Sequence, residues 1–157
     1  MSDEAVAADL QIISPAFGDA EPIPVQYTCK GQDISPPLNF INVPSGSASL
    51  VLIMHDPDAP SGDYVHWTMW DIPTNTETLA ANSVPLGVVQ GINSSGQNGY
   101  MGPCPPAGSG THRYIFELYA VDTTLSLPPE TDRAALVNAM QGHIIDQHTL
   151  TGTFSAA

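Results

Sequence analysis

The chain has 157 residues, 42% of them hydrophobic, which is enough for one domain with an ordinary packed core. Its 16 Asp and Glu residues face only 3 Lys and Arg residues, so the formal net charge is −13. Such a surface repels nucleic acids and anionic bilayers, which excludes both as partners. The acidity is typical of a protein adapted to saline or acidic surroundings, and an anion site would have to work locally against this field.

The N-terminus, MSDEAVAADL, lacks the basic start and long apolar run of a signal peptide, and no segment approaches the ~20 apolar residues of a membrane span. We therefore expect one soluble, cytoplasmic domain over residues 1–157, with no stable membrane insertion and with residues 1–9 as a flexible tail. The two cysteines, Cys29 and Cys104, lie far apart and form no CxxC pair, so they are either two buried thiols or one disulfide. A disulfide would instead favour a secreted or periplasmic protein from which a signal peptide has been removed.

Extended segments dominate the chain. Residues 27–44 alternate short extended pieces with Pro and Gly breaks, and the apolar run SLVLIMHD at 49–56 predicts a strand buried on both faces. Residues 64–73 and 112–122 are rich in aromatic and β-branched residues and are bounded by Gly and Pro, which predicts two core strands. Residues 149–155, near the C-terminus, are predicted to form an edge or return strand.

Only one segment has a convincing helical pattern. After LPPETD, the segment RAALVNAMQGHIIDQ at 133–147 places Val137, Met140 and Ile144 at helical spacing. Acidic residues stand before it, where a helix N-terminus favours them. Gly142 is expected to break or kink this helix.

A twenty-residue stretch of mostly Gly, Pro, Ser and Asn, residues 91–110, lies between the predicted strands at 64–73 and 112–122. A loop this long inside a compact domain usually has a functional reason. Strand alternation in 112–122 places His112 and Tyr114 on one face. Two imidazoles and a phenol donate hydrogen bonds to a phosphate or carboxylate, and a carboxylate behind an imidazole fixes its tautomer. The candidate anion site, walled by residues 100–106, therefore contains Asp56, Asp58, His66, His112 and Tyr114.

Each of these residues also has a structural explanation. Asp56 and Asp58 flank a proline, and Asx residues in that position commonly cap a turn. His66 precedes a tryptophan and is compatible with a hydrogen-bonded core histidine. His112 and Tyr114 are compatible with polar tips on a packed face. The pattern alone does not decide between these readings.

Four motifs together resemble one family. DPDAP at 56–60, HW at 66–67, GPCPP at 102–106 and HRYIFELYAVD at 112–122 look like the phosphatidylethanolamine-binding protein family, specifically its bacterial and archaeal Raf-kinase-inhibitor-like branch. YTCKGQDISPPLNF and GHIIDQHTLTGTF are similar to that branch too. The resemblance extends from about residue 10 to the end of the chain.

The resemblance implies a mostly β fold, a Greek-key-like β-sandwich of two antiparallel sheets with one or two short helices near the C-terminus. It also implies an anion pocket at one end of the sandwich. Carried over to this sequence, the pocket-lining positions are Asp56, His66, His112 and Tyr114. The supporting turn contains Asp58 and Pro60, and the wall contains Pro103, Pro105 and Pro106.

The function implied is a non-catalytic binding, regulatory or inhibitor-like module without a cofactor. Its ligand would carry phosphate, a phosphorylated headgroup or a carboxylate; no protein partner is identified, and a homodimer stays open. The alternative is an esterase-like hydrolase using His112, His66 and Asp56 with a serine of NSS or GSG, although the chain has no G-x-S-x-G elbow. Two histidines and a carboxylate are also the ligand set of a facial-triad iron site, which the family does not favour.

Three local predictions follow for the site. His66 and His112 should lie on adjacent strands within reach of one anion. The Ala59–Pro60 bond is the favoured cis peptide in the turn. Cys29 and Cys104 lie in two segments similar to the prokaryotic branch, so a bridge between them is expected, with a reduced pair as the alternative.

Overall fold

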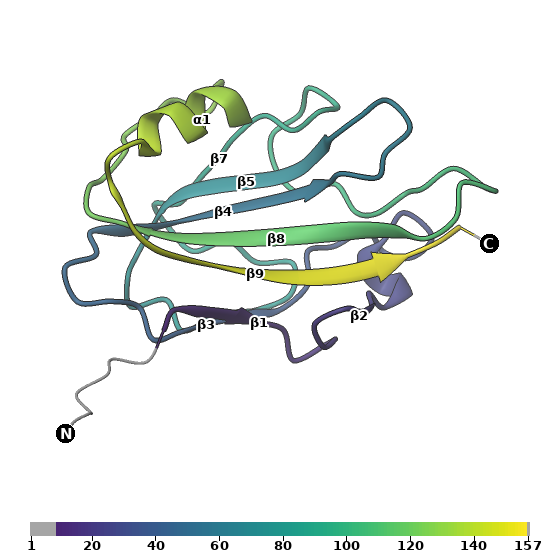
Figure 1. The fold of residues 1–157 in the computed structure, drawn as a ribbon, viewed down its shortest axis with the longest axis horizontal. Coiled ribbons are helices and arrows are strands. Elements are labelled where there is room, and N and C mark those ends of the chain that lie inside the picture. Colours follow the sequence, from purple (N-terminus) through teal and green to yellow (C-terminus); the bar gives the residue numbers. More distant parts are fainter. Residues whose placement is uncertain (1–8, 157) are drawn as a thin grey trace.

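The computed structural model describes residues 9–156, so the tail expected over residues 1–9 falls, except for Asp9, outside the described part. A large sheet has a small sheet on one face and a helix on the other (Figure 1). In chain order the elements are β1 (Gln11–Ile13), β2 (Glu21–Pro22), a 3₁₀ turn η1 (Val25–Tyr27), β3 (Leu38–Ile41), β4 (Ser49–Asp56), β5 (Tyr64–Ile72), β6 (Thr78–Leu79), β7 (Val89–Gln90), β8 (His112–Val121), α1 (Arg133–Met140) and β9 (Ile144–Phe154).

The two sheets confirm the predicted β-sandwich. The large sheet has the order β2-β9-β8-β4-β5-β7 and the small sheet the order β1-β3-β6. All paired strands are antiparallel except β2 and β9, which run parallel. Because β2 pairs with its end, β9 is not a simple edge strand.

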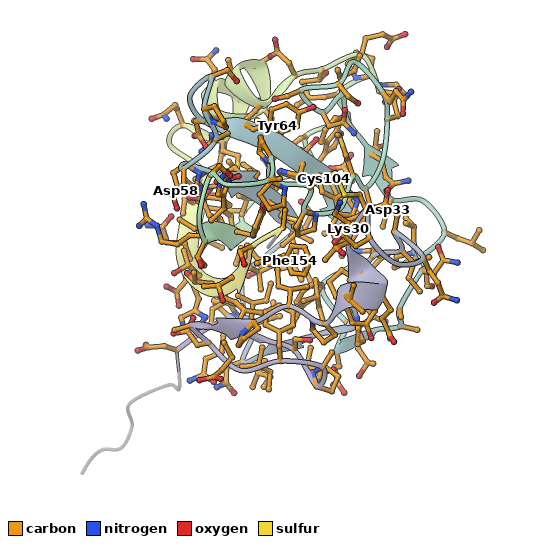
Figure 2. All side chains as sticks on the ribbon, turned by 90° about the vertical axis from the view of Figure 1, so that its right-hand side faces the viewer. Lys30, Asp33, Asp58, Tyr64, Cys104 and Phe154 are labelled. Atoms are coloured by element: carbon orange, nitrogen blue, oxygen red, sulfur yellow. A yellow bond between two sulfur atoms is a disulfide. The ribbon has the colours of Figure 1, made fainter. Side chains whose placement is uncertain are left out.

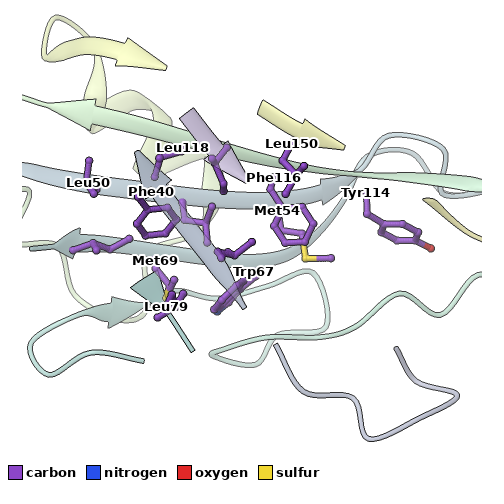
Figure 3. Close-up of a cluster of buried hydrophobic side chains, with 14 of the residues drawn as sticks. Phe40, Leu50, Met54, Trp67, Met69, Leu79, Tyr114, Phe116, Leu118 and Leu150 are labelled. Atoms are coloured by element: carbon purple, nitrogen blue, oxygen red, sulfur yellow. The ribbon is translucent and has the colours of Figure 1, made fainter. Parts of the chain in front are cut away.

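Strand β4 is buried along its whole length, as its continuous apolar sequence predicts. Leu50, Leu52 and Met54 pack into the core between the two sheets (Figure 3). Val51 and Ile53 point the other way and pack with the helix. The last inward residue of β4 is Asp56, so a carboxylate ends this apolar face.

The predicted helix over 133–147 is too long by seven residues. Helix α1 starts after Asp132, whose side chain accepts a hydrogen bond from the Ala135 N–H at 3.0 Å, and it ends at Met140. The break expected at Gly142 is confirmed, because Gly142 has φ of 82°, a left-handed conformation that ends the helix and reverses the chain. Ile144 then pairs with Val121 and begins β9, which starts five residues before the predicted strand.

The turn between β4 and β5 differs from the prediction in one respect. Every peptide bond among residues 9–156 is trans, so the cis bond expected at Ala59–Pro60 is wrong. The reversal is made instead by Gly62, which has φ of 108° and donates its N–H to the Ala59 carbonyl at 3.0 Å. No helix in the described part of the chain is long and apolar enough to span a bilayer.

Candidate functional site

A cavity of about 280 Å³ opens at one end of the large sheet, where the β4–β5 turn, the start of β8 and the loop after Tyr100 meet. Figure 2 looks onto this end, with the lining residues Tyr64 and Cys104 near the middle of the view and Asp58 to one side. The lining residues are Asp56, Ala59, Pro60, Ser61, Tyr64, His66, Met101, Cys104, Pro105, Pro106, His112 and Tyr114.

The deepest charged contact of the site joins two strands. The Asp56 carboxylate at the end of β4 lies 2.7 Å from Nδ1 of His112 at the start of β8, and both side chains are almost fully buried. A carboxylate accepts only, so Nδ1 carries the hydrogen, and Asp56 thereby fixes the tautomer of neutral His112. The other nitrogen, Nε2, is then the one available for chemistry.

Asp56 also closes the turn that the sequence suggested. Its Oδ1 accepts the Asp58 backbone N–H at 2.8 Å across Pro57. Asp58 points away from the cavity and forms a two-pronged contact with the Arg113 guanidinium, 2.9 Å for each prong, while also accepting the Arg113 N–H at 2.9 Å. These hydrogen bonds lower the pKa of Asp58 to about 2. Asp58 therefore anchors the turn to β8 and does not line the cavity.

His66 enters the cavity through an irregularity of β5. On β4, the neighbours Met54 and His55 pair with Trp67 and Val65, so His66 has no partner and forms a β-bulge. Without this bulge, alternation would direct His66 away from the face that carries Trp67. Since β4 lies between β5 and β8, the prediction that His66 and His112 occupy adjacent strands is wrong, although both line the same cavity.

Tyr114 continues the inward face of β8, two residues after His112, as alternation predicts. Its ring packs edge-on to His66, with centroids 5.3 Å apart, and stacks near His112 at 6.3 Å. Figure 3 shows Tyr114 at one end of the hydrophobic core, with its hydroxyl directed away from the other labelled residues. This hydroxyl is buried and has no hydrogen-bond partner among the described residues. Burial, the nearby Asp56 charge and a polar interaction with the Asp56 carboxylate, too long or too poorly aligned to be a hydrogen bond, raise its pKa, so it is a neutral donor facing the cavity.

The wall of the cavity is tied to the segment around η1. The bridge expected between Cys29 and Cys104 is confirmed, with Cα atoms 5.4 Å apart. The Cys29 N–H donates to the Pro103 carbonyl at 3.1 Å, and the Gly102 N–H donates to Asp33 at 2.8 Å. Pro103 is consequently held behind the wall and does not line the cavity, whereas Pro105, Pro106 and Pro60 do.

Ser109 adds a contact that the sequence pattern could not place. Its hydroxyl lies 2.9 Å from Nε2 of His112 and donates to the Pro106 carbonyl at 2.7 Å. Ser109 is exposed, while His112 behind it is buried. The Ser109 hydroxyl therefore contacts Nε2, the nitrogen of His112 that faces outward.

The predicted set did not name four of the lining residues, which are Ala59, Ser61, Tyr64 and Met101. Tyr64 precedes His66 by two positions, so strand alternation was the signal that would have found it. Met101 lies in the predicted wall segment, and its carbonyl contacts Nδ1 of His66 at 2.5 Å. The Tyr64 hydroxyl reaches the Met101 sulfur at 3.4 Å, which joins the turn to the wall.

A second charged cluster lies on the opposite face of the large sheet, between the sheet and α1. Nδ1 of His55 lies 2.7 Å from Asp63, and its Nε2 lies 3.2 Å from Glu117. Arg133 contacts both carboxylates, at 2.5 and 3.8 Å. Burial disfavours the charge on His55, but the hydrogen bonds to Glu117 and Asp63 outweigh it and raise the pKa of His55. This cluster stabilises the hairpin against the helix and is separate from the cavity.

The cavity has little positive charge of its own. Its lining contains no Lys or Arg, since Arg113 pairs with Asp58 outside it and Arg133 lies across the sheet. Within residues 9–156, no group of three or more His, Cys, Asp or Glu side chains is arranged to hold a metal ion. The facial-triad alternative therefore has no geometric support, because Asp56 faces His112 as a hydrogen-bond partner.

Comparison with known proteins gives consistent results. The family model described as phosphatidylethanolamine-binding protein matches residues 13–155. A UPF0098 protein of Methanothermobacter thermautotrophicus is 46% identical over 144 residues, covering 88% of this chain and 94% of that protein. A UPF0098 protein of Pyrococcus horikoshii, PH1269, is 45% identical over 148 residues, covering 90% and 75%. A relative in Mycobacterium tuberculosis, LppC, 44% identical over 148 residues and covering 94% and 73%, carries a lipoprotein name.

Solved structures are similar as well. CT736 of Chlamydia trachomatis, described as a homologue of phosphatidylethanolamine-binding protein, superposes with a TM-score of 0.91 at 40% identity, covering 95% of this chain and 99% of that one. YbcL of Escherichia coli, described as a member of the mammalian family, gives 0.89 at 27% identity, covering 96% and 100%. With the family model spanning nearly the whole described chain, this protein belongs to the phosphatidylethanolamine-binding protein family.

Proposed function

We propose that the cavity binds a small ligand through an anionic head, phosphate or carboxylate, and that the protein acts as a binding and regulatory module. The observation that carries the proposal is the unpartnered Tyr114 hydroxyl, buried at the cavity beside two imidazoles. A buried polar group without a partner costs free energy, and a ligand oxygen that accepts from it recovers that cost.

The construction of the walls supports a site that exists before the ligand arrives. Pro60, Pro105 and Pro106 restrict the backbone around the cavity, and the disulfide at Cys104 ties one wall to the rest of the fold. A preformed site loses little conformational entropy on binding, which favours affinity for a small ligand. The acidic protein surface would disfavour a ligand held on an anionic membrane, so a soluble ligand suits this site better.

Calorimetric titration with inorganic phosphate tests the proposal. Wild-type protein is expected to bind saturably, and Tyr114→Phe, which removes only the hydroxyl, is expected to bind several-fold more weakly. Tyr119→Phe is the matched control, because the Tyr119 hydroxyl donates to Glu117 at 3.0 Å on the other face of β8. Equal affinity in all three proteins, or no binding by any of them, would exclude the proposed site.

A hydrolase is a second candidate, favoured by one observation. Ser109, His112 and Asp56 form a hydrogen-bonded series with distances of 2.9 and 2.7 Å, in the order of nucleophile, base and carboxylate. The hydroxyl of Ser109 also has the Pro106 carbonyl as an acceptor, which competes with donation to the imidazole. Turnover of a small ester that is lost in both Ser109→Ala and His112→Ala would support hydrolysis, whereas binding without turnover would support the binding module.

We propose that the protein works where its disulfide persists. Such bridges are stable in secreted and periplasmic proteins and in the cytoplasm of some hyperthermophiles, but not in an ordinary reducing cytosol. Alkylation and mass spectrometry of protein taken directly from its native cells would test this location. Alkylation of both Cys29 and Cys104 without a reductant would show that the bridge is reduced in the cell and would support an ordinary reducing cytosol as the location.

A further inference from the structure

We infer that the cavity selects anionic heads that carry a proton on one oxygen, as phosphomonoester and phosphonate monoanions do, over phosphodiesters of the same charge. His66 is the residue that distinguishes them. This inference rests on the proposed function and defines the ligand class of the same site.

The first step is the direction of the hydrogen bond between His66 and the wall. Nδ1 of His66 lies 2.5 Å from the Met101 carbonyl oxygen, which only accepts, so Nδ1 carries a hydrogen. The Met101 N–H donates back to the His66 carbonyl at 3.0 Å, and this second bond fixes the loop against β5. Nε2 is therefore the ring nitrogen that remains for a ligand.

The second step is the charge state of the ring. Burial lowers the pKa of His66, and the neighbouring His55 acts in the same direction. The Met101 carbonyl and the charges of Asp56 and Asp33 act in the opposite direction and do not outweigh burial. With Nδ1 protonated in a neutral ring, Nε2 has a lone pair and accepts a hydrogen bond.

The third step concerns the other polar groups around the cavity. Tyr114 offers a hydroxyl donor. Nε2 of neutral His112 is an acceptor that already contacts the Ser109 hydroxyl, because Nδ1 carries the hydrogen toward Asp56. Both oxygens of Asp56 already have partners. The cavity lining contains no Lys or Arg, so the cavity suits a single negative charge better than two.

A head with one P–OH group satisfies this arrangement. One of its unprotonated oxygens accepts from Tyr114, while its P–OH donates to Nε2 of His66. A phosphodiester has the same charge but replaces the P–OH with a second ester group, so Nε2 would be buried without a donor. Sites that leave a buried polar group unpartnered reject such analogues strongly.

Two isomers provide the test, because ethyl phosphate and dimethyl phosphate have the same atoms but only the first has a P–OH group as a monoanion. At several pH values between about 5 and 6, below the second ionisation of phosphomonoesters near pH ~6, both are mainly monoanions, and burial favours the neutral His66 ring. We expect calorimetry to show that ethyl phosphate binds at least about tenfold more tightly than dimethyl phosphate. Equal affinities, or tighter binding of dimethyl phosphate, would overturn the inference and leave the proposed function intact. Failure of both isomers and of inorganic phosphate to bind would overturn the proposed function itself.

Two variants assign the selectivity to a residue. His66→Phe removes the acceptor, so we expect the preference for ethyl phosphate to fall to about one. Tyr114→Phe removes a donor that serves both isomers, so we expect weaker binding of each with the tenfold ratio retained. If folded His66→Phe protein keeps the preference for ethyl phosphate over dimethyl phosphate, another group accepts the hydrogen bond from the P–OH, and the role given to His66 is contradicted. The wild-type comparison decides the ligand class even if His66→Phe does not fold.

Discussion

Asp56 and His112, separated by 56 residues, meet at 2.7 Å where the inward faces of β4 and β8 change from apolar to polar. Their neighbours on these faces, Met54 and Tyr114, belong to the hydrophobic core. The core therefore holds the two strands in a register that brings the carboxylate and the imidazole together. This contact fixes the tautomer of neutral His112, so that Nε2 is the nitrogen directed toward the cavity mouth and Ser109.

Replacing His66 or His112 with Ala should weaken phosphate binding by roughly tenfold or more, the usual effect of losing a hydrogen bond to a charged group. Calorimetry with inorganic phosphate measures the change. His143→Ala is the control, since His143 is exposed and pairs with Asp122. Unchanged affinity in both site variants would show that phosphate does not bind in this cavity.

Ser109→Ala should strengthen phosphate binding by a few-fold. The Ser109 hydroxyl occupies Nε2 of His112 at 2.9 Å, and an anion has to replace it there. A hydrogen bond of this kind contributes about 1 kcal/mol net, which limits the gain to roughly a few-fold. Weaker binding in this variant would show that the hydroxyl instead donates to the ligand. Ser95→Ala, in the long loop and bonded to Asn93, serves as the control.

Asp58→Asn should destabilise the fold at neutral pH by less than about 1 kcal/mol, because its Arg113 partner is exposed and such pairs contribute little. The folded pKa of Asp58, about 2, lies below its ordinary value of 3.8, so its contribution to stability is present above pH 3.8 and is lost as pH falls through 2. Urea unfolding of wild type and Asp58→Asn at several pH values measures this difference. A gap that stays constant between pH 5 and pH 2 would disagree with the assigned contact; exposed Glu130→Gln should show little effect throughout.

His55→Gln should lower stability most at acidic pH. Hydrogen bonds to Glu117 and Asp63 raise the folded pKa of His55 above 6.5 despite burial, so the charged ring stabilises the fold below pH 6.5. This contribution disappears as pH rises through the folded pKa. The stability difference between wild type and His55→Gln should therefore shrink above pH 6.5, and a difference that grows with pH would refute the network.

Replacing both bridge cysteines with Ser should cost up to about 4 kcal/mol, the chain-entropy value for closing a loop of 75 residues. The hydrogen bonds from Cys29 to Pro103 and from Gly102 to Asp33 remain, so the wall before residue 104 should keep its position. Thermal unfolding with and without a thiol reductant measures the cost. An unchanged midpoint would mean that the bridge contributes nothing beyond these hydrogen bonds.

Alternation and apolar runs predicted the long strands well, because β4 is buried on both faces and β8 presents His112 and Tyr114 inward. The motif resemblance supplied the sandwich and most of the cavity lining. Local pattern failed where backbone geometry or distant contacts decide the outcome. The β-bulge at His66 is set by pairing with β4. Although the break of the helix at Gly142 itself was predicted from the sequence, the residues after Gly142 form a strand because they pair with β8. Likewise, the outward position of Asp58 follows from its contact with Arg113 across the turn.

The most direct test of the account is the ¹⁵N spectrum of the imidazole rings during a titration with inorganic phosphate. We predict saturable shifts of the Nε2 resonances of His66 and His112 with one common dissociation constant. His148 should not respond, because its Nδ1 accepts the Ile12 N–H at 3.0 Å between β9 and β1, and it does not line the cavity. Absence of saturation at both cavity histidines, or an equal drift of His148, would contradict the claim that this cavity is an anion site.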